Sequence, residues 1–191
     1  MMERPWAADP PWTGDPDWPV ADAVIAWENP FFEAGYDRVE RPDGECADYY
    51  WIDPPDAALI LAVTDDEEVV VVEQYRPRLR LHVLGLPAGG VDPGEDPEAA
   101  AGRELREETG YTADSLSHLD TYVPSGWARY RRHVFVAEGI TPSDPDHDEG
   151  EFIETDLVPA EELLDVVRER PGPAFGGVLT PLLLAREAGV I

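Results

Sequence analysis

Two continuous apolar runs dominate the pattern of hydrophobic and polar positions: ALILAV at 58–63 and VVVVEQY at 69–75. The polar segment TDDEE separates them, which predicts two buried strands joined in a hairpin. Further strands are expected near 130–137 (YRRHVFVA) and near 152–157. These segments would form the sheet of the protein.

One helix is indicated together with both of its ends, over residues 97–109. Asp96 can cap its N-terminus, Pro97 suits the first helical position, and Gly110 can end it. The boundaries of this helix are therefore predicted from the residues that flank it.

Two more helices are expected near the C-terminus. The first, at about 159–169, has an apolar stripe formed by Ala160, Leu163, Leu164 and Val167. The other should start with Thr180 and Pro181 and stop at Gly189. Strands before, between and after helices are typical of a mixed sheet with helices on its faces, so the fold class is α/β or α+β.

Residues 1–20 are rich in Pro, Asp and Trp. Because proline restricts the backbone and removes hydrogen-bond donors, an extended, irregular segment is expected here. Trp6, Trp12 and Trp18 should dock on the domain itself or on a second subunit.

The charge of the chain is strongly negative. Asp and Glu total 41 against 14 basic residues, all of them Arg, which gives a net charge of −27. The acids are spread along the whole chain, so we interpret them as a surface adapted to concentrated salt rather than a site for a basic partner. The composition resembles that of halophilic archaeal proteins. Nucleic-acid partners are not expected, because backbone binding requires basic patches.

Cys46 is the only cysteine, so an intramolecular disulfide and a multi-cysteine zinc site are both excluded. The N-terminus lacks the apolar core of a signal peptide, and no apolar run is long enough to span a bilayer. A cytoplasmic protein without a membrane partner is therefore expected.

The informative segment is LPAGGVDPGEDPEAAAGRELREETGY at 86–111. Glu104, Glu107 and Glu108 are spaced i, i+3 and i+4, which places them on one face of the predicted helix. Such like charges repel, and a hard divalent cation would offset the repulsion, because magnesium takes oxygen ligands from carboxylates, water and phosphate. The alternative interpretation is a solvated, Glu-rich helix surface.

In this segment Gly89 is followed after five residues by Glu95 and, after seven more, by RELREETGY at 103–111. Every fixed identity of the Nudix box is present at this spacing, including Gly110, so the chain resembles the Nudix hydrolases. The resemblance implies an α/β/α sandwich with a mixed sheet, in which the box forms a loop–helix–loop. It also implies that Arg103 and Glu95 form an orienting salt bridge.

The resemblance further implies a metal site. Glu104 and Glu108 would be the primary ligands, and Glu107 would support them or bind a second ion. In the ADP-ribose branch of the family the backbone carbonyl at the position of Ala88 also binds metal. The implied cofactor is Mg²⁺, for which Mn²⁺ can substitute.

Three other segments resemble ADP-ribose pyrophosphatases: EQYRP at 73–77, TYVPSGW at 121–127 and DEGEFIE at 148–154. They imply hydrolysis of ADP-ribose, a small nucleoside diphosphate derivative, to AMP and ribose 5-phosphate. The acidic loop would supply the general base, Glu149 or Glu151. The alternative is that this loop is only a solvated charged segment.

Two departures fall where relatives recognise the nucleotide. Many relatives carry an acidic residue at the position of Gly85, and they often show a Ser/Asp/Glu run where this chain has WARYRRH at 127–133. The base and sugar preferences are therefore open. Trp127 is a candidate for stacking on a base, with a plain core role as the alternative.

Arginines form two clusters in this acidic chain. At strand spacing Arg129, Arg131 and His133 would share one face, and a further cluster, RPRLR, lies at 76–80. Because the guanidinium fork matches phosphate oxygens, Arg76, Arg129 and Arg131 are candidates for binding the substrate. The alternative is that they pair with the abundant surface carboxylates.

We expect residues 1–50 to form an N-terminal extension with a small strand region, and 51–191 to form the hydrolase domain. The extension resembles the segment that related enzymes exchange between subunits, which implies a homodimer. The alternative functions are hydrolysis of nucleotide sugars or dinucleoside polyphosphates, nucleotide sensing without catalysis, and a purely structural role. The intact glutamate set argues against sensing, and a purely structural role would leave the exact box unexplained.

Overall fold

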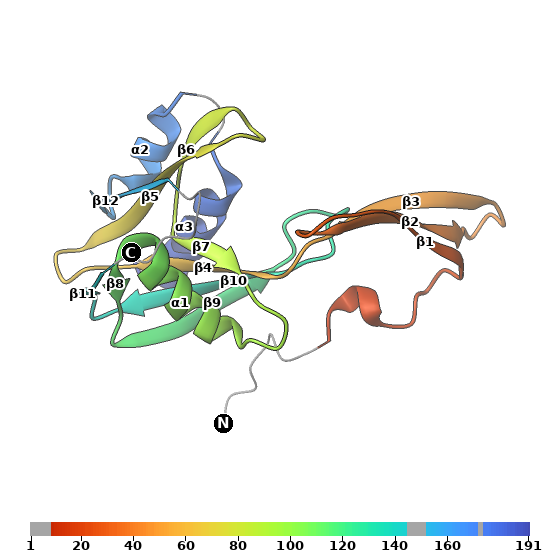
Figure 1. Ribbon diagram of the computed structural model, residues 1–191, viewed down its shortest axis with the longest axis horizontal. Helices are drawn as coiled ribbons and strands as arrows, with labels where there is room; N and C mark the ends of the chain where they lie inside the picture. Colours follow the sequence, from red (N-terminus) through yellow and green to blue (C-terminus); the bar gives the residue numbers. More distant parts are fainter. Residues whose placement is uncertain (1–8, 145–151, 172–173) are drawn as a thin grey trace. The chain divides into compact units, whose positions relative to one another are not determined.

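The computed structural model describes residues 9–144, 152–171 and 174–191. The chain divides into two compact units (Figure 1). The first unit comprises Met1–Ala57 and Thr121–Arg132, and the second comprises Ala58–Asp120 and His133–Ile191. The predicted boundary at residue 50 stays a prediction.

The first unit is built on a three-stranded antiparallel sheet. The order is β1 (Val20–Glu28), β2 (Glu33–Glu40) and β3 (Cys46–Asp53), preceded by the short 3₁₀ helix η2 (Pro11–Thr13). A Cβ atom on Gly35 would overlap the main-chain oxygen of Val24 and meet the indole of Trp51, so only glycine fits at this point of β2.

The second unit contains the remaining strands in separate ladders. One ladder has the order β7 (Ala88–Gly90), β4 (Ala57–Ala62), β10 (Arg132–Glu138) and β9 (Ser115–Tyr122). A second has the order β12 (Ile153–Pro159), β5 (Glu68–Arg76) and β6 (Leu81–Gly85), and β11 (Thr141–Pro142) pairs with β8 (Tyr111–Thr112). The helices are α1 (Pro97–Thr109), α2 (Leu163–Glu169) and α3 (Gly176–Ala188).

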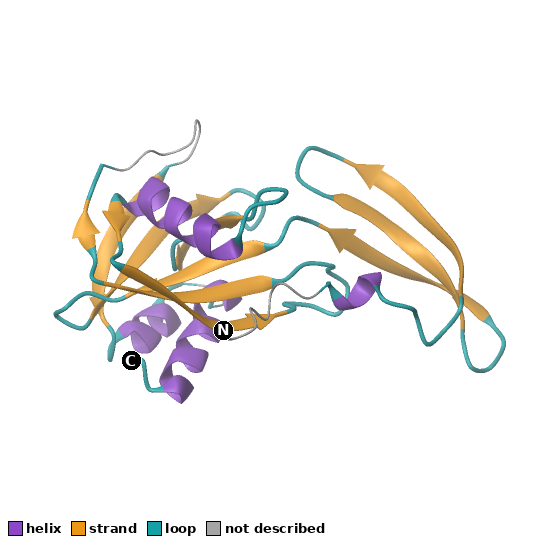
Figure 2. Cartoon of the chain, turned by 90° about the horizontal axis from the view of Figure 1, so that it is seen from below, coloured by secondary structure: helices purple, strands orange, loops and turns teal. Residues whose placement is uncertain are grey.

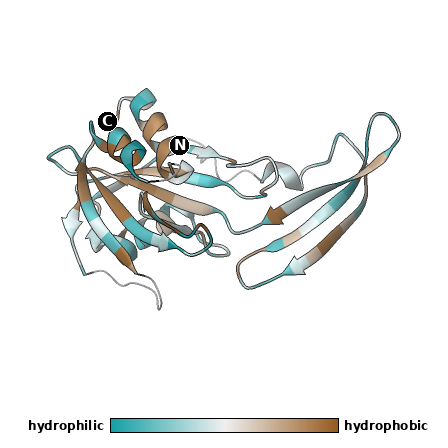
Figure 3. Ribbon diagram, turned by 90° about the horizontal axis from the view of Figure 1, so that it is seen from above, coloured by the Kyte–Doolittle hydropathy of each residue, from teal (hydrophilic) through white to brown (hydrophobic). Residues whose placement is uncertain are grey.

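Figure 2 shows α1 on one side of the strands and α2 and α3 on the other, so the second unit is layered α/β/α. The continuous apolar runs are the buried strands: the side chains of Val69, Val70 and Val71 are fully buried. Long stretches of the strands are brown, and so hydrophobic, in Figure 3. In the hydrophobic core, Val69 and Val71 of β5 pack with residues of α2 and α3, among them Leu163 and Leu182. The predicted class, helices on a sheet, is confirmed.

Helix α1 has the predicted boundaries. The side chain of Asp96 accepts a hydrogen bond from the main-chain N–H of Glu98, and Pro97 occupies the first turn. Gly110 ends the helix in a left-handed conformation (φ 70°), which glycine adopts without a steric penalty. Leu105, on the buried face of α1, is fully buried.

The predicted hairpin of 58–63 and 69–75 is wrong. β4 and β5 belong to different ladders, and their contact is limited to the turn, where Val63 and Val69 form an antiparallel bridge and the N–H of Thr64 donates to the oxygen of Glu68 at 2.9 Å. A buried apolar run identifies a strand but not its partner, because such strands are apolar on both faces.

Three other element boundaries differ from the prediction. Helix α2 begins at Leu163 and not near residue 159, because β12 extends to Pro159. Helix α3 begins at Gly176 and contains Pro181, so the proline does not mark its start. Strand β10 begins at Arg132, so Arg129 and Arg131 precede it and do not share a strand face with His133. Among the described residues, no helix is both long and apolar enough to cross a membrane.

Candidate active site

Strand β7 and helix α1 lie against each other and bring the two halves of the box segment (86–111) together. The main-chain N–H of Ala88 donates a hydrogen bond of 2.9 Å to Oε2 of Glu108. The Glu108 side chain is buried, with 5% of its surface exposed. Because burying a carboxylate is unfavourable without polar partners, this contact fixes Glu108 next to the main chain of β7.

Gly89 faces a second glutamate of the helix. A Cβ atom at this position would overlap the carboxylate of Glu104. The absence of a side chain on Gly89 therefore leaves the space that the Glu104 carboxylate fills, and it brings that carboxylate against the main chain beside Ala88.

Arg103 connects the carboxylates of the box segment. Its Nε donates to Glu95 at 3.0 Å and its NH2 group donates to the same carboxylate at 2.9 Å. The predicted pair of Arg103 and Glu95 is thus present, with both carboxylate oxygens engaged. The guanidinium also donates to Glu104 at 2.7 Å and Glu107 at 3.1 Å, and to the main-chain oxygen of Gly90 at 2.9 Å.

The charges of this network stabilise one another. The hydrogen bond from Arg103 lowers the pKa of Glu95, more than partial burial raises it. In turn Glu95, together with Glu104 and Glu107, raises the pKa of Arg103. Glu95 also accepts a hydrogen bond from the main-chain N–H of Asp92, so the loop ahead of α1 is tied to the helix.

Among residues 9–144, 152–171 and 174–191, no three His, Cys, Asp or Glu side chains converge closely enough to hold a metal ion as they stand. The guanidinium of Arg103 donates to both Glu104 and Glu107. The carboxylates of Glu104, Glu107 and Glu108 therefore do not converge on one point. The donor set nevertheless fits a hard divalent cation. It offers carboxylate oxygens on one helix face, a buried Glu108, and main chain at the side-chain-free Gly89.

The structure pairs two of the candidate arginines with carboxylates inside the first unit. Arg129 donates to Asp37, and Arg131 forms an ion pair of 2.7 Å with Asp56. Both arginines thus pair with carboxylates, which is the alternative to phosphate binding given for them above. Trp127 is 60% exposed, so it is not a core residue. In the second unit Arg76 is half-buried at the end of β5.

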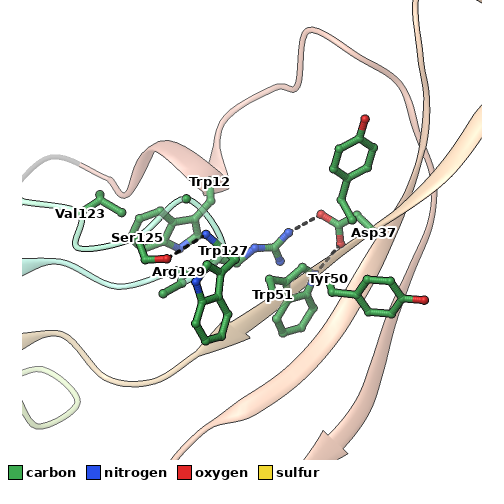
Figure 4. A pocket seen from close by; sticks show the side chains of 11 residues that line it. Trp12, Asp37, Tyr50, Trp51, Val123, Ser125, Trp127 and Arg129 are labelled. Atoms are coloured by element: carbon green, nitrogen blue, oxygen red, sulfur yellow. Dashed lines mark hydrogen bonds and ion pairs between the residues drawn. The ribbon is translucent and has the colours of Figure 1, made fainter.

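Glu149 and Glu151 lie outside the described residues. The sequence reasoning missed Asp37 and Asp56, which pair with the arginines, and Trp51, whose ring lies under the guanidinium of Arg129 (Figure 4). No local signal identifies them, since Asp37 is 92 residues from its partner Arg129.

A helix face of carboxylates beside a side-chain-free strand is an arrangement that can hold a divalent cation against phosphate groups. Such an arrangement is typical of the class of metal-dependent hydrolases that act on phosphorylated compounds.

The sequence profile of the NUDIX domain matches residues 37–176. Because this range covers more than half of the chain, the chain belongs to the Nudix family, and it is a Nudix hydrolase. It is 38% identical over 135 residues to the ADP-ribose pyrophosphatase of Bacillus subtilis, covering 69% of this chain and 73% of that protein.

Two other comparisons agree on the family and the fold. The methanol dehydrogenase activator of Bacillus methanolicus is 34% identical over 137 residues, which is 70% of this chain and 74% of that protein. A crystal structure of an ADP compounds hydrolase superposes with a TM-score of 0.79 at 24% identity, covering 90% of this chain and 93% of that chain. The latter likeness shows the fold, and it confirms the predicted Nudix-type sandwich.

Proposed function

We propose that this Nudix hydrolase cleaves the pyrophosphate bond of ADP-ribose to give AMP and ribose 5-phosphate, with Mg²⁺ as its cofactor and Mn²⁺ as a substitute. The observation that carries the proposal is the placement of Glu104 and Glu108 against the main chain of Ala88 and Gly89. The choice of substrate is supported by the name of the Bacillus subtilis relative and by the segments at 73–77 and 121–127.

The box segment would supply the ligands of the cation. Glu104, Glu107 and Glu108 would contribute carboxylate oxygens, and Ala88 would contribute its carbonyl oxygen. A bound divalent cation neutralises the diphosphate and lowers the pKa of a coordinated water. Arg103 is a positioning residue. It orients the carboxylates of Glu104 and Glu107, and it holds the loop ahead of α1 through Glu95.

In the reaction, water adds to one phosphorus and the bridging oxygen leaves with the other phosphate. We expect attack at the nucleotide side, so that AMP receives the oxygen of water. The base that removes the proton would be Glu149 or Glu151. Hydrolysis in ¹⁸O-labelled water tests the direction, since label on ribose 5-phosphate would contradict it.

Arg76, Arg129 and Arg131 remain candidates for phosphate contact. Arg131 keeps its ion pair with Asp56, so a phosphate would add to this pair rather than meet an isolated cation. The extension at 1–50 is proposed as the segment exchanged in a homodimer. A sedimentation measurement on the full chain that gives a monomer at micromolar concentration would refute the dimer.

The central test is a product assay in concentrated salt with ADP-ribose, nucleotide sugars and dinucleoside polyphosphates, with and without Mg²⁺. We expect Mg²⁺-dependent release of AMP from ADP-ribose. In Glu108→Gln the rate should fall at least about 100-fold, because the amide can still accept from Ala88 but no longer neutralises a cation. Glu98→Gln makes the same chemical change on the same helix outside the site and should keep the wild-type rate.

Each outcome decides one part of the proposal. Wild-type rates in Glu108→Gln would remove the metal assignment. Cleavage of another compound of the panel with ADP-ribose left intact would overturn the substrate but leave the hydrolase. Binding of ADP-ribose without any cleavage in Mg²⁺ or Mn²⁺ would favour the sensing alternative.

A further inference from the structure

The second unit contains a pocket beside the end of α3, which we call the α3 pocket. Its volume is about 370 Å³, enough for a small molecule. The turn between β4 and β5, the turn between β12 and α2, and the last residues of the chain line it. None of the residues 86–111, all of which the structure describes, takes part. The α3 pocket is therefore separate from the candidate active site.

Main-chain hydrogen bonds hold the walls of the α3 pocket in place. The N–H of Ala160 donates to the oxygen of Glu67 at 2.9 Å, which joins the two turns. The N–H of Glu67 donates to the oxygen of Thr64 at 3.1 Å, and the N–H of Val190 donates to the oxygen of Ala185 at 2.9 Å. Because these walls are already ordered, a ligand gains affinity from not having to order them.

Most of the uncharged surface of the α3 pocket is aliphatic. The apolar lining residues are Val63, Pro159, Ala160, Val190 and Ile191, which we call the apolar wall. Three of them, Val63, Ala160 and Ile191, also pack against the hydrophobic core. None of the lining residues is aromatic, so the pocket has no ring on which a nucleobase could stack. It suits an aliphatic group.

Charged side chains of both signs complete the lining: Asp66, Glu67, Glu161 and Arg186. Within residues 9–144, 152–171 and 174–191 none of these four side chains forms an ion pair, and the guanidinium of Arg186 contacts the main-chain oxygen of Glu161 at 3.4 Å. Opposite charges thus share one pocket without pairing. A ligand that carries both charges can pair with both at once.

The arrangement of these charges disfavours simpler ligands. In the part of the chain that the structure describes, no three acidic side chains converge closely enough to hold a metal ion. A phosphate is disfavoured, because three carboxylates share the pocket with one guanidinium. A simple amine would leave Arg186 without an anionic partner. The matching ligand is a small zwitterion with an aliphatic part.

We propose that the α3 pocket binds an aliphatic α-amino acid. The carboxylate of the amino acid accepts hydrogen bonds from Arg186, since a guanidinium presents parallel donors that match a carboxylate. The ammonium group pairs with the carboxylates of the β4–β5 turn, Asp66 and Glu67, and the side chain covers the apolar wall. The proposal does not depend on the proposed function, because the pocket and the box segment share no residue.

Three analogues of L-leucine, each lacking one group, test the three contacts. The amine 3-methylbutylamine lacks the carboxylate, 4-methylpentanoate lacks the ammonium group, and glycine lacks the aliphatic side chain. Binding is measured by NMR titration of the ¹⁵N-labelled full chain in concentrated salt. We expect L-leucine to bind with a dissociation constant in the millimolar range or below, and each analogue to bind at least about tenfold more weakly.

The same titration locates the site. The amide signals of Glu67, Ala160 and Arg186 should move as L-leucine is added. The absence of binding, movement confined to signals outside the α3 pocket, or equal binding of any one analogue overturns the proposal.

Arg186→Gln tests the contact with the carboxylate. L-leucine should bind about tenfold or more weakly to this variant, whereas binding of 3-methylbutylamine should not weaken, because this amine has no carboxylate to lose a partner. Arg168→Gln removes an exposed arginine outside the pocket and should bind L-leucine as the wild type does. Equal effects of the two substitutions on L-leucine overturn the assignment of Arg186.

Glu67→Gly tests the contact with the ammonium group. Glu67 has a left-handed conformation (φ 59°), which glycine adopts at a lower cost than other residues. The variant should therefore unfold at a higher urea concentration than the wild type and yet bind L-leucine more weakly, a combination that a loss of structure would not produce. Unchanged binding of L-leucine overturns the role of Glu67.

Arg80→Gly is the matched control for Glu67→Gly. Arg80 has nearly the same φ, 57°, and lies outside the pocket. This variant should bind L-leucine as the wild type does. Weaker binding here as well would overturn the location of the site.

The hydrolysis assay separates this inference from the proposed function. Saturating L-leucine should leave the KM for ADP-ribose unchanged, because the two ligands occupy separate sites. Competition between them would place L-leucine in the substrate site and overturn the α3 pocket. A protein that binds L-leucine through Arg186 but does not cleave ADP-ribose keeps the pocket and loses the proposed function.

Discussion

Gly89 and Glu104 are in direct apposition: the space that a side chain on Gly89 would fill is occupied by the carboxylate of Glu104. In Gly89→Ala the methyl group must push this carboxylate away from the main chain of β7. We expect the Mg²⁺ concentration for half-maximal rate to rise about 10- to 100-fold, as for other changes that misplace a ligand. Unfolding in urea should change little, because Glu104 can move without disturbing the core.

Gly90→Ala is the matched control for this substitution. A Cβ atom on Gly90 meets nothing within 4 Å. The variant should therefore need the same Mg²⁺ concentration as the wild type. If both substitutions raised the required Mg²⁺ concentration equally, a change in the conformation of β7, and not displacement of the Glu104 carboxylate, would be the cause.

Arg103→Lys should lower both activity and stability. A lysine cannot reproduce the paired hydrogen bonds to Glu95 while also reaching Glu104 and Glu107. We expect kcat to fall about tenfold or more, and the free energy of unfolding to fall by about 1–3 kcal/mol. Arg168→Lys makes the same exchange at an exposed position of α2, outside the box segment, and should change neither quantity measurably.

The stability of the protein should depend on pH through Glu95. Arg103 lowers the pKa of Glu95 below its ordinary value of 4.5. A carboxyl whose pKa is lower in the folded state adds stability above its ordinary pKa, and this part is lost as the pH falls through the lowered value.

In Glu95→Gln the stabilisation from the ionised Glu95 carboxylate is missing at every pH. The variant should be less stable than the wild type near neutral pH, and the difference should shrink as the pH falls below about 4. Urea unfolding of both proteins between pH about 7 and about 3 measures this. A constant difference across the range would exclude Glu95 as the titrating group.

Leu105→Ala tests how α1 is held on the strands. Leu105 is fully buried, so its truncation should lower the free energy of unfolding by about 2–5 kcal/mol. Leu79→Ala removes an exposed side chain, 52%, and should change it by less than about 0.5 kcal/mol. A small effect of Leu105→Ala in urea would mean that α1 contributes little to the core.

The box segment was predictable because its signals are local. Asp96, Pro97 and Gly110 determine both ends of α1, and the pair of Arg103 and Glu95 that the family resemblance implied is present. Capping residues and neighbours on one helix turn act within a few residues, so the sequence alone identifies them.

The parts that failed depend on distant partners. The apolar run at 58–63 does not show that its strand pairs in a different ladder from 69–75. Pro181 lies in the second turn of α3, where proline is uncommon, so its position was not predictable from proline's preference for helix starts. Likewise Arg129 could have contacted a phosphate or any of the many carboxylates. Its actual partner, Asp37, is chosen by the tertiary structure.

The guanidinium of Arg103 among Glu95, Glu104 and Glu107 gives the box segment its own internal counterion. Glutamates that would otherwise repel one another are thus held together before any divalent cation arrives. We therefore expect a chelator to abolish activity without unfolding the protein, and the return of divalent cations to restore it.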